Sequence, residues 1–238
     1  MMKKQINPKD KHSLRGERGL KTRSHIIETM KKLLIEKEYI SITTSEVAKR
    51  AGVNEGLIYH YFESKDDLFW SVVEEYMFKY VKFVEIHIQG AKGALNKIRN
   101  FIWANIYMLS KGRVRGKLLL LEVRNNPQYY KTKAYALSVT NSSILLNLIN
   151  EGIASGEISE TINPYSLRNT IIGALEHAVL PIIIHEKNRD VDVLTDQICE
   201  IIFSGITRKD DMMTSLIKKV DSIEKEIKKL TIERSTES

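Results

Sequence analysis

Residues 43–68, TTSEVAKRAGVNEGLIYHYFESKDDL, constrain the fold of this chain more than any other stretch. Thr43, Asn54 and Ser64 are residue types that cap helix N-termini by accepting a hydrogen bond from a free backbone N–H. Three helices should therefore start in quick succession. The spacing of the caps leaves room for two short helices, and the third helix can be longer.

A tight turn, Ala51-Gly52-Val53, separates the first two of these helices. Thr43 and Glu46 form a capping-box pattern at the start of the first helix. Gly52 stands at its end, where a residue in the left-handed conformation is favoured. Two short helices joined by a turn containing glycine form a helix-turn-helix. In that motif the second helix enters the major groove of DNA, and its N-terminal residues reach the base edges.

The side chains around the turn form a pattern that is more specific than a helix-turn-helix alone. It comprises Thr43-Thr44, Val47-Ala48, Ala51-Gly52-Val53, Gly56, Ile58-Tyr59-His60-Tyr61-Phe62, Ser64-Lys65 and Leu68. This pattern resembles the DNA-binding signature of the TetR family of bacterial regulators. The resemblance is sharp over about the first third of the chain and weaker beyond it. It implies an all-α fold, with a three-helix DNA-binding head and a C-terminal helical domain for effector binding and dimerisation.

The resemblance also implies which residues meet DNA. The candidates are Thr43, Thr44, Asn54, Glu55, Gly56, Leu57, Tyr59, His60, Tyr61 and Lys65. In the family, the equivalents of Tyr59, His60 and Lys65 contact phosphates, which positions the protein without reading the sequence. Base readout is expected from the first turn of the second helix, where an Asn can pair with adenine and a Glu can accept from cytosine. Core packing is the alternative for Tyr61 and Phe62, and it is favoured for Phe62.

Glu55 departs from the family pattern, because many members carry Lys or another residue at this position. A carboxylate close to DNA phosphates lowers affinity by charge repulsion. Its presence in the recognition helix therefore indicates either a contribution to specificity or a tolerated change.

Positive charge gathers ahead of the helix-turn-helix. The chain has 238 residues and a formal net charge of +7. Residues 1–23 hold eight basic and two acidic side chains, a net +6, which leaves about +1 for the remainder. This charge can neutralise phosphates beside the motif, or it can belong to a solubilising tail. Because residues 1–20 are poor in apolar side chains, we predict a flexible basic arm there.

Apolar side chains recur at helical spacing along the rest of the chain. The expected helices cover residues 21–39, 65–89, 94–110, 116–124, 129–155, 164–185 and 191–206. No segment shows sustained alternation with a period of two, so no sheet is expected. The predicted domains are the arm (1–20), the helix-turn-helix domain (21–68), the effector-binding and dimerisation domain (69–207) and a C-terminal helical extension (208–238).

The C-terminal extension carries a heptad pattern over three heptads. The a and d positions are Met213, Leu216, Val220, Ile223, Ile227 and Leu230. This is typical of a short two-stranded coiled coil. A helix that packs on its own domain, or a loosely ordered tail, remains the alternative.

The resemblance implies a two-fold homodimer formed by the last two core helices. The expected interface residues are the most apolar positions of residues 165–206, namely Leu167, Ile171, Leu175, Val179, Leu194, Ile198, Ile201 and Ile202. Such a dimer places two recognition helices one helical turn apart. It should therefore bind a pseudo-palindromic double-stranded DNA operator.

Three strings are similar to the fatty-acid-responsive branch of the family, the repressors of fatty acid degradation that bind long-chain acyl-CoA. They are Leu121-Glu122-Val123-Arg124, Glu151-Gly152-Ile153-Ala154-Ser155-Gly156-Glu157-Ile158 and Gly173-Ala174-Leu175-Glu176-His177. A small apolar effector, suspected to be an acyl-CoA, should release the protein from its operator. A sensor of drugs or other small molecules within the same family is the alternative.

The expected effector pocket combines apolar and charged side chains. Its candidates are Trp103, Ile106, Tyr107, Leu120, Glu122, Arg124, Leu145, Leu148, Glu176 and His177. Helix core is the alternative reading of the apolar members. The charged members interrupt apolar stretches, and since a buried charge must be paired they should pair with one another or face a pocket. Arg113, Arg115 and Lys117 could meet acidic groups of a ligand, or they could lie in a solvated loop.

Several classes of protein are disfavoured. The single cysteine, Cys199, excludes an internal disulfide and fits a reducing cytoplasm. We find no apolar run judged long enough to span a bilayer and no signal core, so no membrane partner is expected. The motifs of zinc proteases, phosphate-binding loops and serine hydrolases are missing, so we expect neither an enzyme nor a cofactor or metal site. A nonspecific architectural DNA-binding protein is the competing class.

Overall fold

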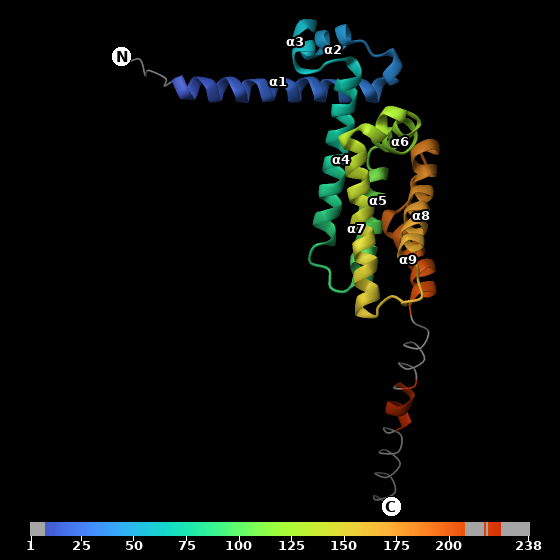
Figure 1. Ribbon diagram of the computed structural model, residues 1–238. Coiled ribbons are helices and arrows are strands. Elements are labelled where there is room, and N and C mark those ends of the chain that lie inside the picture. The colour runs from blue at the N-terminus through green and yellow to red at the C-terminus, as the bar shows by residue number, and fades with distance from the viewer. Residues whose placement is uncertain (1–7, 208–216, 218, 225–238) are drawn as a thin grey trace, which may run out of the picture. The chain divides into compact units, whose positions relative to one another are not determined.

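The computed structural model describes residues 8–207, 217 and 219–224, apart from the side chains of residues 8–15 and 113. Within these residues every regular element is a helix (Figure 1), which confirms the all-α prediction. The elements are α1 (Pro8–Glu36), η1 (Tyr39–Ser41), α2 (Thr44–Ala51), α3 (Glu55–Tyr61), α4 (Lys65–Ile88), α5 (Ala94–Ser110), α6 (Arg113–Lys117), η2 (Leu118–Glu122), η3 (Val123–Asn125), η4 (Pro127–Lys131), α7 (Lys133–Ser155), α8 (Pro164–His185) and α9 (Val191–Ile206).

Helix α1 begins earlier than predicted. Residues 8–20 continue the helix, whereas the sequence had suggested an irregular arm. Pro8 is well placed at the first helical position, because its fixed φ suits a helix and its missing N–H would be unbonded there anyway. Gly16 and Gly19 do not end this helix, since a glycine inside a helix costs only about 1 kcal/mol. The part of the predicted arm before Pro8 lies outside the described residues.

The three predicted caps of the helix-turn-helix are confirmed. Thr43 accepts a hydrogen bond from the Glu46 N–H at 3.2 Å, and Asn54 accepts one from the Leu57 N–H at 2.7 Å. Gly52 ends α2 in the left-handed conformation, with φ of 65°. The reciprocal half of the first capping box is not made, because the Glu46 carboxylate binds Lys37 instead.

The third cap is reciprocal and starts α4. Ser64 Oγ accepts from the Asp67 N–H at 3.1 Å, and the Asp67 carboxylate accepts from the Glu63 N–H at 2.9 Å. Two backbone donors that the helix itself cannot bond are thus satisfied.

The chain divides into two compact units. The first consists of residues 1–85, 107–141 and 179–188, and the second of residues 86–106, 142–178 and 189–238. In the first unit α1 packs against α2, and α2 against α3, over a core that includes Ile26, Met30 and Ile58. These units do not follow the predicted boundary at residue 68, so that boundary remains a prediction about function.

The short helix predicted at residues 116–124 is a composite of three helix types. It starts as α6, becomes π-helical in η2 and ends as the 3-10 turn η3. The Val123 N–H bonds to the carbonyl of Leu118, five residues back, which is the π-helical spacing. Likewise, the helix predicted from residue 129 starts as the 3-10 turn η4, and α7 begins only at Lys133.

Helix α8 differs from the expectation that no apolar run is long enough to span a bilayer. Among the described helices it alone is long and apolar enough, by length and composition, to cross a membrane. The core helix of a soluble protein can pass the same test, so this is weak evidence of a membrane span. Only 28% of its most apolar stretch is buried, so the described residues leave much of its surface without cover.

Six of the eight predicted dimer residues pack inside the chain. Leu167, Ile171, Leu175, Val179, Leu194 and Ile202 are all less than 9% exposed. A side chain that is buried inside its own chain offers little surface to a second copy, so burial does not support these six interface residues, which stay predictions. Ile198 is half-buried and Ile201 is 75% exposed, so Ile201 is the member that a partner could reach.

The structure describes only two of the six residues of the predicted heptad pattern. Val220 and Ile223 lie in helical residues and are exposed. Met213, Leu216, Ile227 and Leu230 lie outside the described residues. The coiled coil therefore stays a prediction.

Candidate DNA-binding surface and effector sites

The first turn of α3 and the start of α2 form an accessible surface. Its exposed or half-buried side chains are those of Thr43, Thr44, Asn54, Glu55, Leu57, Tyr59 and His60, and the backbone at Gly56 is also exposed. Ile58 and Phe62 on the opposite side of α3 are buried, as favoured for Phe62. The arrangement is that of a helix whose apolar side holds it to α2 while its polar side can meet a groove.

Three polar side chains on this surface contact one another. Thr44 Oγ1 lies 2.5 Å from Glu55 Oε1 and 3.2 Å from the Tyr59 hydroxyl. Thr44 belongs to α2, and the other two belong to α3, so the contacts join the two helices. Because its carboxylate is held in one position, Glu55 can present an acceptor to a base without first losing its side-chain freedom.

Two predicted contact residues are engaged elsewhere in the head. The Lys65 ammonium donates to the carbonyls of Ile42 at 2.9 Å and Tyr39 at 3.3 Å, and it lies over the Tyr39 ring. It therefore fixes the chain before α2, and this does not fit the expected phosphate contact. The half-buried Tyr61 has its hydroxyl close to Gly19 of α1, so packing, the alternative reading, describes it better.

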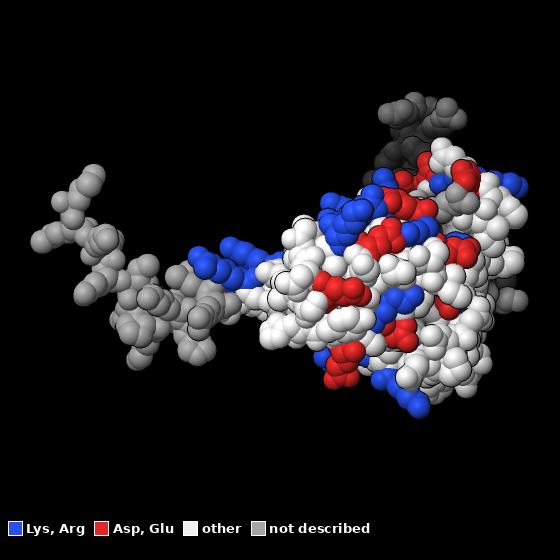
Figure 2. All heavy atoms as spheres, turned by 90° about the horizontal axis from the view of Figure 1, so that it is seen from above, with Lys and Arg blue, Asp and Glu red and all other residues white. Residues whose placement is uncertain are grey.

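Charges of both signs share the face drawn in Figure 2. Lys and Arg side chains are interspersed with Asp and Glu side chains, and the face is not uniformly basic. Arg18 and Lys21 are exposed on α1 and add positive charge beside the helix-turn-helix. A mixed surface favours binding that depends on specific contacts more than on bulk attraction to phosphates.

We predict that Glu55→Gln lowers specificity. Removing this charge should raise affinity for random duplex, because one repulsion from phosphates is lost. The preference for the operator should fall by about 5-fold or more, the lower end of the 1–3 kcal/mol for a base contact. Competition binding at fixed salt, with an operator selected from a random pool, measures both quantities. Glu63→Gln removes the same charge just outside α3 and should leave the preference unchanged; an equal effect would rule out readout by Glu55.

The predicted effector pocket is not brought together as expected. Ile106, Leu120, Leu145 and Leu148 are buried core residues. Trp103 donates its indole N–H to Asp192 at 2.7 Å and stacks on His87, while Tyr107 stacks on Phe83. The ten candidates are divided between the two compact units.

The charged candidates are not buried as the pairing argument required. Glu122, Arg124 and His177 are exposed, and Glu176 is half-buried. Glu122 pairs with Lys117 at 3.5 Å. Of the ten predicted pocket residues, Glu122 is the one that lines the cavity at the end of α1 in the first unit.

The string Glu151–Ile158 has a structural role in the second unit. The Glu157 carboxylate accepts from the N–H groups of Ala94 at 2.8 Å and Leu95 at 3.2 Å, so it caps α5. These backbone bonds, chiefly the one from Ala94, hold the pKa of Glu157 below its ordinary value although burial acts the other way. Gly156 adopts a φ of 81° at the end of α7. A helix end and a cap therefore explain this string without an effector.

Arg115, which was expected to meet an acidic ligand group or to lie in a solvated loop, is a half-buried cation in the first unit. Its guanidinium donates to the Met108 carbonyl at 2.8 Å, while its buried Nε–H has no hydrogen-bond partner. No ion pair with a carboxylate is found for it within the described residues. Burial raises the pKa of the nearby Tyr76, and the Arg115 charge acts in the opposite direction. An uncompensated, half-buried cation is suited to an acidic ligand group.

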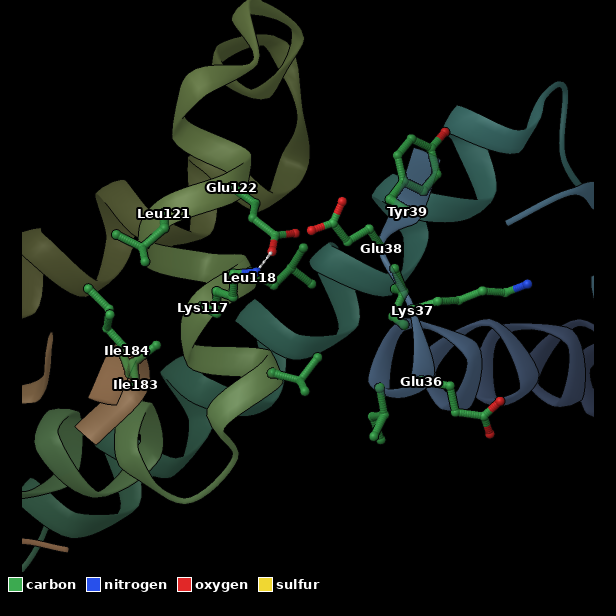
Figure 3. A pocket seen from close by; sticks show the side chains of 13 residues that line it. Glu36, Lys37, Glu38, Tyr39, Lys117, Leu118, Leu121, Glu122, Ile183 and Ile184 are labelled. Atoms are coloured by element: carbon green, nitrogen blue, oxygen red, sulfur yellow. Dashed lines mark ion pairs between the residues drawn. The ribbon is translucent and has the colours of Figure 1, made fainter. Parts of the chain in front are cut away.

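The cavity at the end of α1 is built entirely within the first unit. It measures about 560 Å³ and is lined by Leu34, Ile35, Glu36, Lys37, Glu38, Tyr39, Val114, Lys117, Leu118, Leu121, Glu122, Ile183 and Ile184. Figure 3 shows Lys117 and Glu122 joined across one side of it. No group of three or more His, Cys, Asp or Glu residues that could hold a metal ion occurs in the described part of the chain.

Comparison with known proteins agrees with this arrangement. The family model for bacterial regulatory proteins of the tetR family matches residues 26–72. A second, for the C-terminal region of YsiA-like protein, matches residues 73–205, which is more than half of the chain. Residues 1–25 and 206–238 lie outside both matches.

Similar proteins include regulators of fatty acid metabolism. The fatty acid metabolism regulator protein of Bacillus subtilis is 28% identical over 184 residues, which cover 77% of this chain and 95% of that protein. The crystal structure of FadR from Bacillus subtilis in complex with stearoyl-CoA matches with a TM-score of 0.69 at 28% identity, over 77% of this chain and 98% of that one. FadR from Bacillus halodurans shares the fold, with a TM-score of 0.67 at 23% identity over 76% and 98% of the two chains.

The two family matches meet at residue 72, so together they cover the helix-turn-helix and the helical region that follows it. The motif that suggested the family and the capped geometry of α2 and α3 fall inside the first match. This chain therefore belongs to the TetR family of DNA-binding transcriptional regulators.

Proposed function

We propose that the protein is a cytoplasmic homodimeric repressor that leaves a pseudo-palindromic operator when it binds a long-chain acyl-CoA. The observation that carries the effector is the similarity over most of the chain to the Bacillus subtilis regulator whose structure holds stearoyl-CoA. Ligand binding would favour a spacing of the two recognition helices that does not fit adjacent grooves. A typical coupling energy of about 1–3 kcal/mol would change operator affinity by ~5–150-fold.

The dimer interface is proposed to use the exposed sides of α8 and α9, and not the apolar sides that are buried within the chain. On α8 the exposed stripe is Tyr165, Asn169, Gly173 and His177, and on α9 it is Val193, Gln197, Ile201 and Gly205. Tyr165, Val193 and Ile201 are 58%, 52% and 75% exposed, large values for apolar side chains. Among the described residues outside the helix's own backbone and the chain neighbours, no atom lies within 4 Å of the place that a Cβ would take at Gly173 or Gly205, so a second chain could approach these helices closely. Such mixed stripes suit a protein partner better than a lipid phase.

Arg115 is proposed to hold an acidic group of the acyl-CoA. The ligand carries phosphates, and among the candidate contacts Arg115 combines a positive charge with a buried donor that has no partner. Hydrogen bonds to charged groups contribute about 1.5–3 kcal/mol each. One such contact is enough to decide whether the ligand binds at micromolar concentration.

We expect stearoyl-CoA to release the operator from the native protein and to do so poorly from Arg115→Met. The variant should bind stearoyl-CoA ~10–100-fold more weakly, because a charge-assisted contact is lost, while its operator affinity without ligand stays native. Fluorescence anisotropy of labelled operator during a stearoyl-CoA titration measures both. Arg189→Met, in the exposed segment before α9, is the matched control.

The outcomes separate the parts of the proposal. Failure of stearoyl-CoA to displace the native protein would reject the acyl-CoA effector and leave DNA binding intact. Normal release from Arg115→Met would reject only the anchoring role of Arg115.

A further inference from the structure

The cavity at the end of α1 has exposed apolar side chains at its edge, as far as the described residues show. Its volume of about 560 Å³ lies in the range of small-molecule sites. Leu34, Leu118 and Ile183 form its buried walls, whereas Ile35 and Ile184 at its edge are 63% and 46% exposed. Isoleucines open to water beside a cavity are surface that an apolar ligand can cover favourably.

The charges around the opening do not balance. Five charged side chains line the cavity. Two of them form ion pairs with residues outside the lining, Glu36 with Arg50 and Lys37 with Glu46. Lys117 and Glu122 pair with each other. For the Glu38 side chain, no ion pair or hydrogen bond is found among the described residues. Among the described side chains that line it, the opening therefore keeps one surplus negative charge.

The surplus carboxylate faces a second one. Figure 3 shows the Glu38 and Glu122 side chains extending toward each other, Glu38 from the link between α1 and η1 and Glu122 from η2. Lys117 already offsets the charge of Glu122, so a positive charge bound beside both carboxylates would offset the remaining charge of Glu38. A divalent metal ion would need more oxygen ligands than these two residues supply.

We propose that this cavity is a ligand site for an apolar molecule that carries one ammonium group. The apolar part would lie on Leu118, Ile183 and Ile184, and the ammonium group between Glu38 and Glu122. The phosphates of an acyl-CoA would be repelled by the surplus carboxylate, so the site is distinct from the acyl-CoA contact proposed for Arg115 and does not depend on it. The residues from Leu34 to Tyr39 lead through η1 into α2, so the ligand would sit beside the start of the helix-turn-helix.

Three probes of equal chain length test the proposal on the full-length protein. Decylammonium, decanol and decanoate, each below its micelle concentration, are titrated by calorimetry. Decylammonium should bind best and decanoate worst, with a preference of about 5-fold for the cation over the alcohol, the upper end for a solvent-exposed ion pair. The preference should shrink as salt is added. Equal affinities for the three probes would overturn the proposal.

Two variants test the charge assignment. Glu38→Gln should remove the preference for decylammonium. Glu38→Gln/Glu122→Gln leaves Lys117 without its partner, so the order of the probes should reverse in favour of decanoate. Glu17→Gln makes the same change on α1, outside the residues that line the cavity, and should alter nothing. An unchanged order in the double variant, with native circular dichroism, would refute the role of the two carboxylates.

Filling the cavity tests its location. Leu121→Trp places a larger side chain in the lining and should weaken binding of decylammonium and decanol alike, with native circular dichroism. Full binding by this variant would place the probes elsewhere. Competition between stearoyl-CoA and decylammonium would show that the two sites overlap and would overturn their separation.

Discussion

Replacing Ile201 with glutamate is expected to leave the protein monomeric and to lower its affinity for a two-half-site operator by about 100-fold or more. Ile201 is 75% exposed in the single chain although it is a large apolar residue, and it lies on the open stripe of α9. A carboxylate buried there by a second copy would lose its hydration without gaining a partner. Loss of the dimer removes the effective concentration that one bound head gives the other, commonly worth 10²–10⁴-fold.

Sedimentation velocity and operator titration measure the two effects separately. Ile86→Glu is the matched control, because Ile86 on α4 is 62% exposed and is not part of the proposed stripes. The control should remain dimeric and bind the operator normally. A dimeric Ile201→Glu protein would remove α9 from the interface, and equal dissociation of both variants would point to a general effect of added charge.

The head could be predicted from sequence because its signals are local. Thr43, Asn54 and Ser64 each bond a backbone N–H within three residues, so cap and helix start appear together in the sequence. Gly52 is needed at a positive φ, which few other residues adopt without strain. The contact of Lys65 with the carbonyl of Ile42, 23 residues away, has no such local signal. The phosphate contact expected for Lys65 came from the resemblance to the family and not from a local pattern.

The dimer interface expected from the sequence differs from the burial seen in the fold for a related reason. Periodicity identifies the most apolar stripe of a helix, and in a single chain that stripe is the one already buried, as Leu175 and Ile202 show. The stripe left for a partner mixes Tyr165, Gly173, His177 and Ile201, so it has no simple apolar period. Only the folded chain separates the two.

The effector region depends on contacts between distant residues. Trp103 donates to Asp192 across 89 positions, and Glu157 caps α5 across more than 60. Nothing in the sequence distinguishes such partners from pocket residues. Arg115 was recognised as a candidate by its charge, but its lack of a counterion appears only when its surroundings are known.

Lys31 joins α1 to α4 inside the first unit. Its ammonium lies 2.7 Å from Glu75 and 2.6 Å from Glu28, and its side chain is only 7% exposed. Glu75 is shared with Lys79 at 2.7 Å. Removing Glu75 leaves the buried Lys31 ammonium with only Glu28, whose side chain is 51% exposed, as its partner, whereas removing both members of a buried pair can be nearly neutral.

The same pair predicts how stability changes with pH. Burial alone would raise the pKa of Glu75, but the hydrogen bonds from Lys31 and Lys79 outweigh it and hold the pKa below the ordinary value of 4.5. A carboxyl whose pKa is lower in the folded than in the unfolded state stabilises the fold above its ordinary pKa. This contribution is lost as the pH falls below 4.5 and through the lowered value.

We therefore expect Glu75→Gln to reduce the free energy of unfolding by about 2 kcal/mol at pH 7, because a charge-assisted contact to a buried ammonium is lost. Lys31→Met/Glu75→Gln should recover most of this loss, since the buried charge is removed with its partner. Urea unfolding at pH 7 and at pH 3 measures both variants, and the difference between Glu75→Gln and the native protein should shrink at pH 3. A double variant less stable than Glu75→Gln would show that the Lys31 side chain contributes by packing, and a pH-independent difference would exclude the ionised pair as the cause.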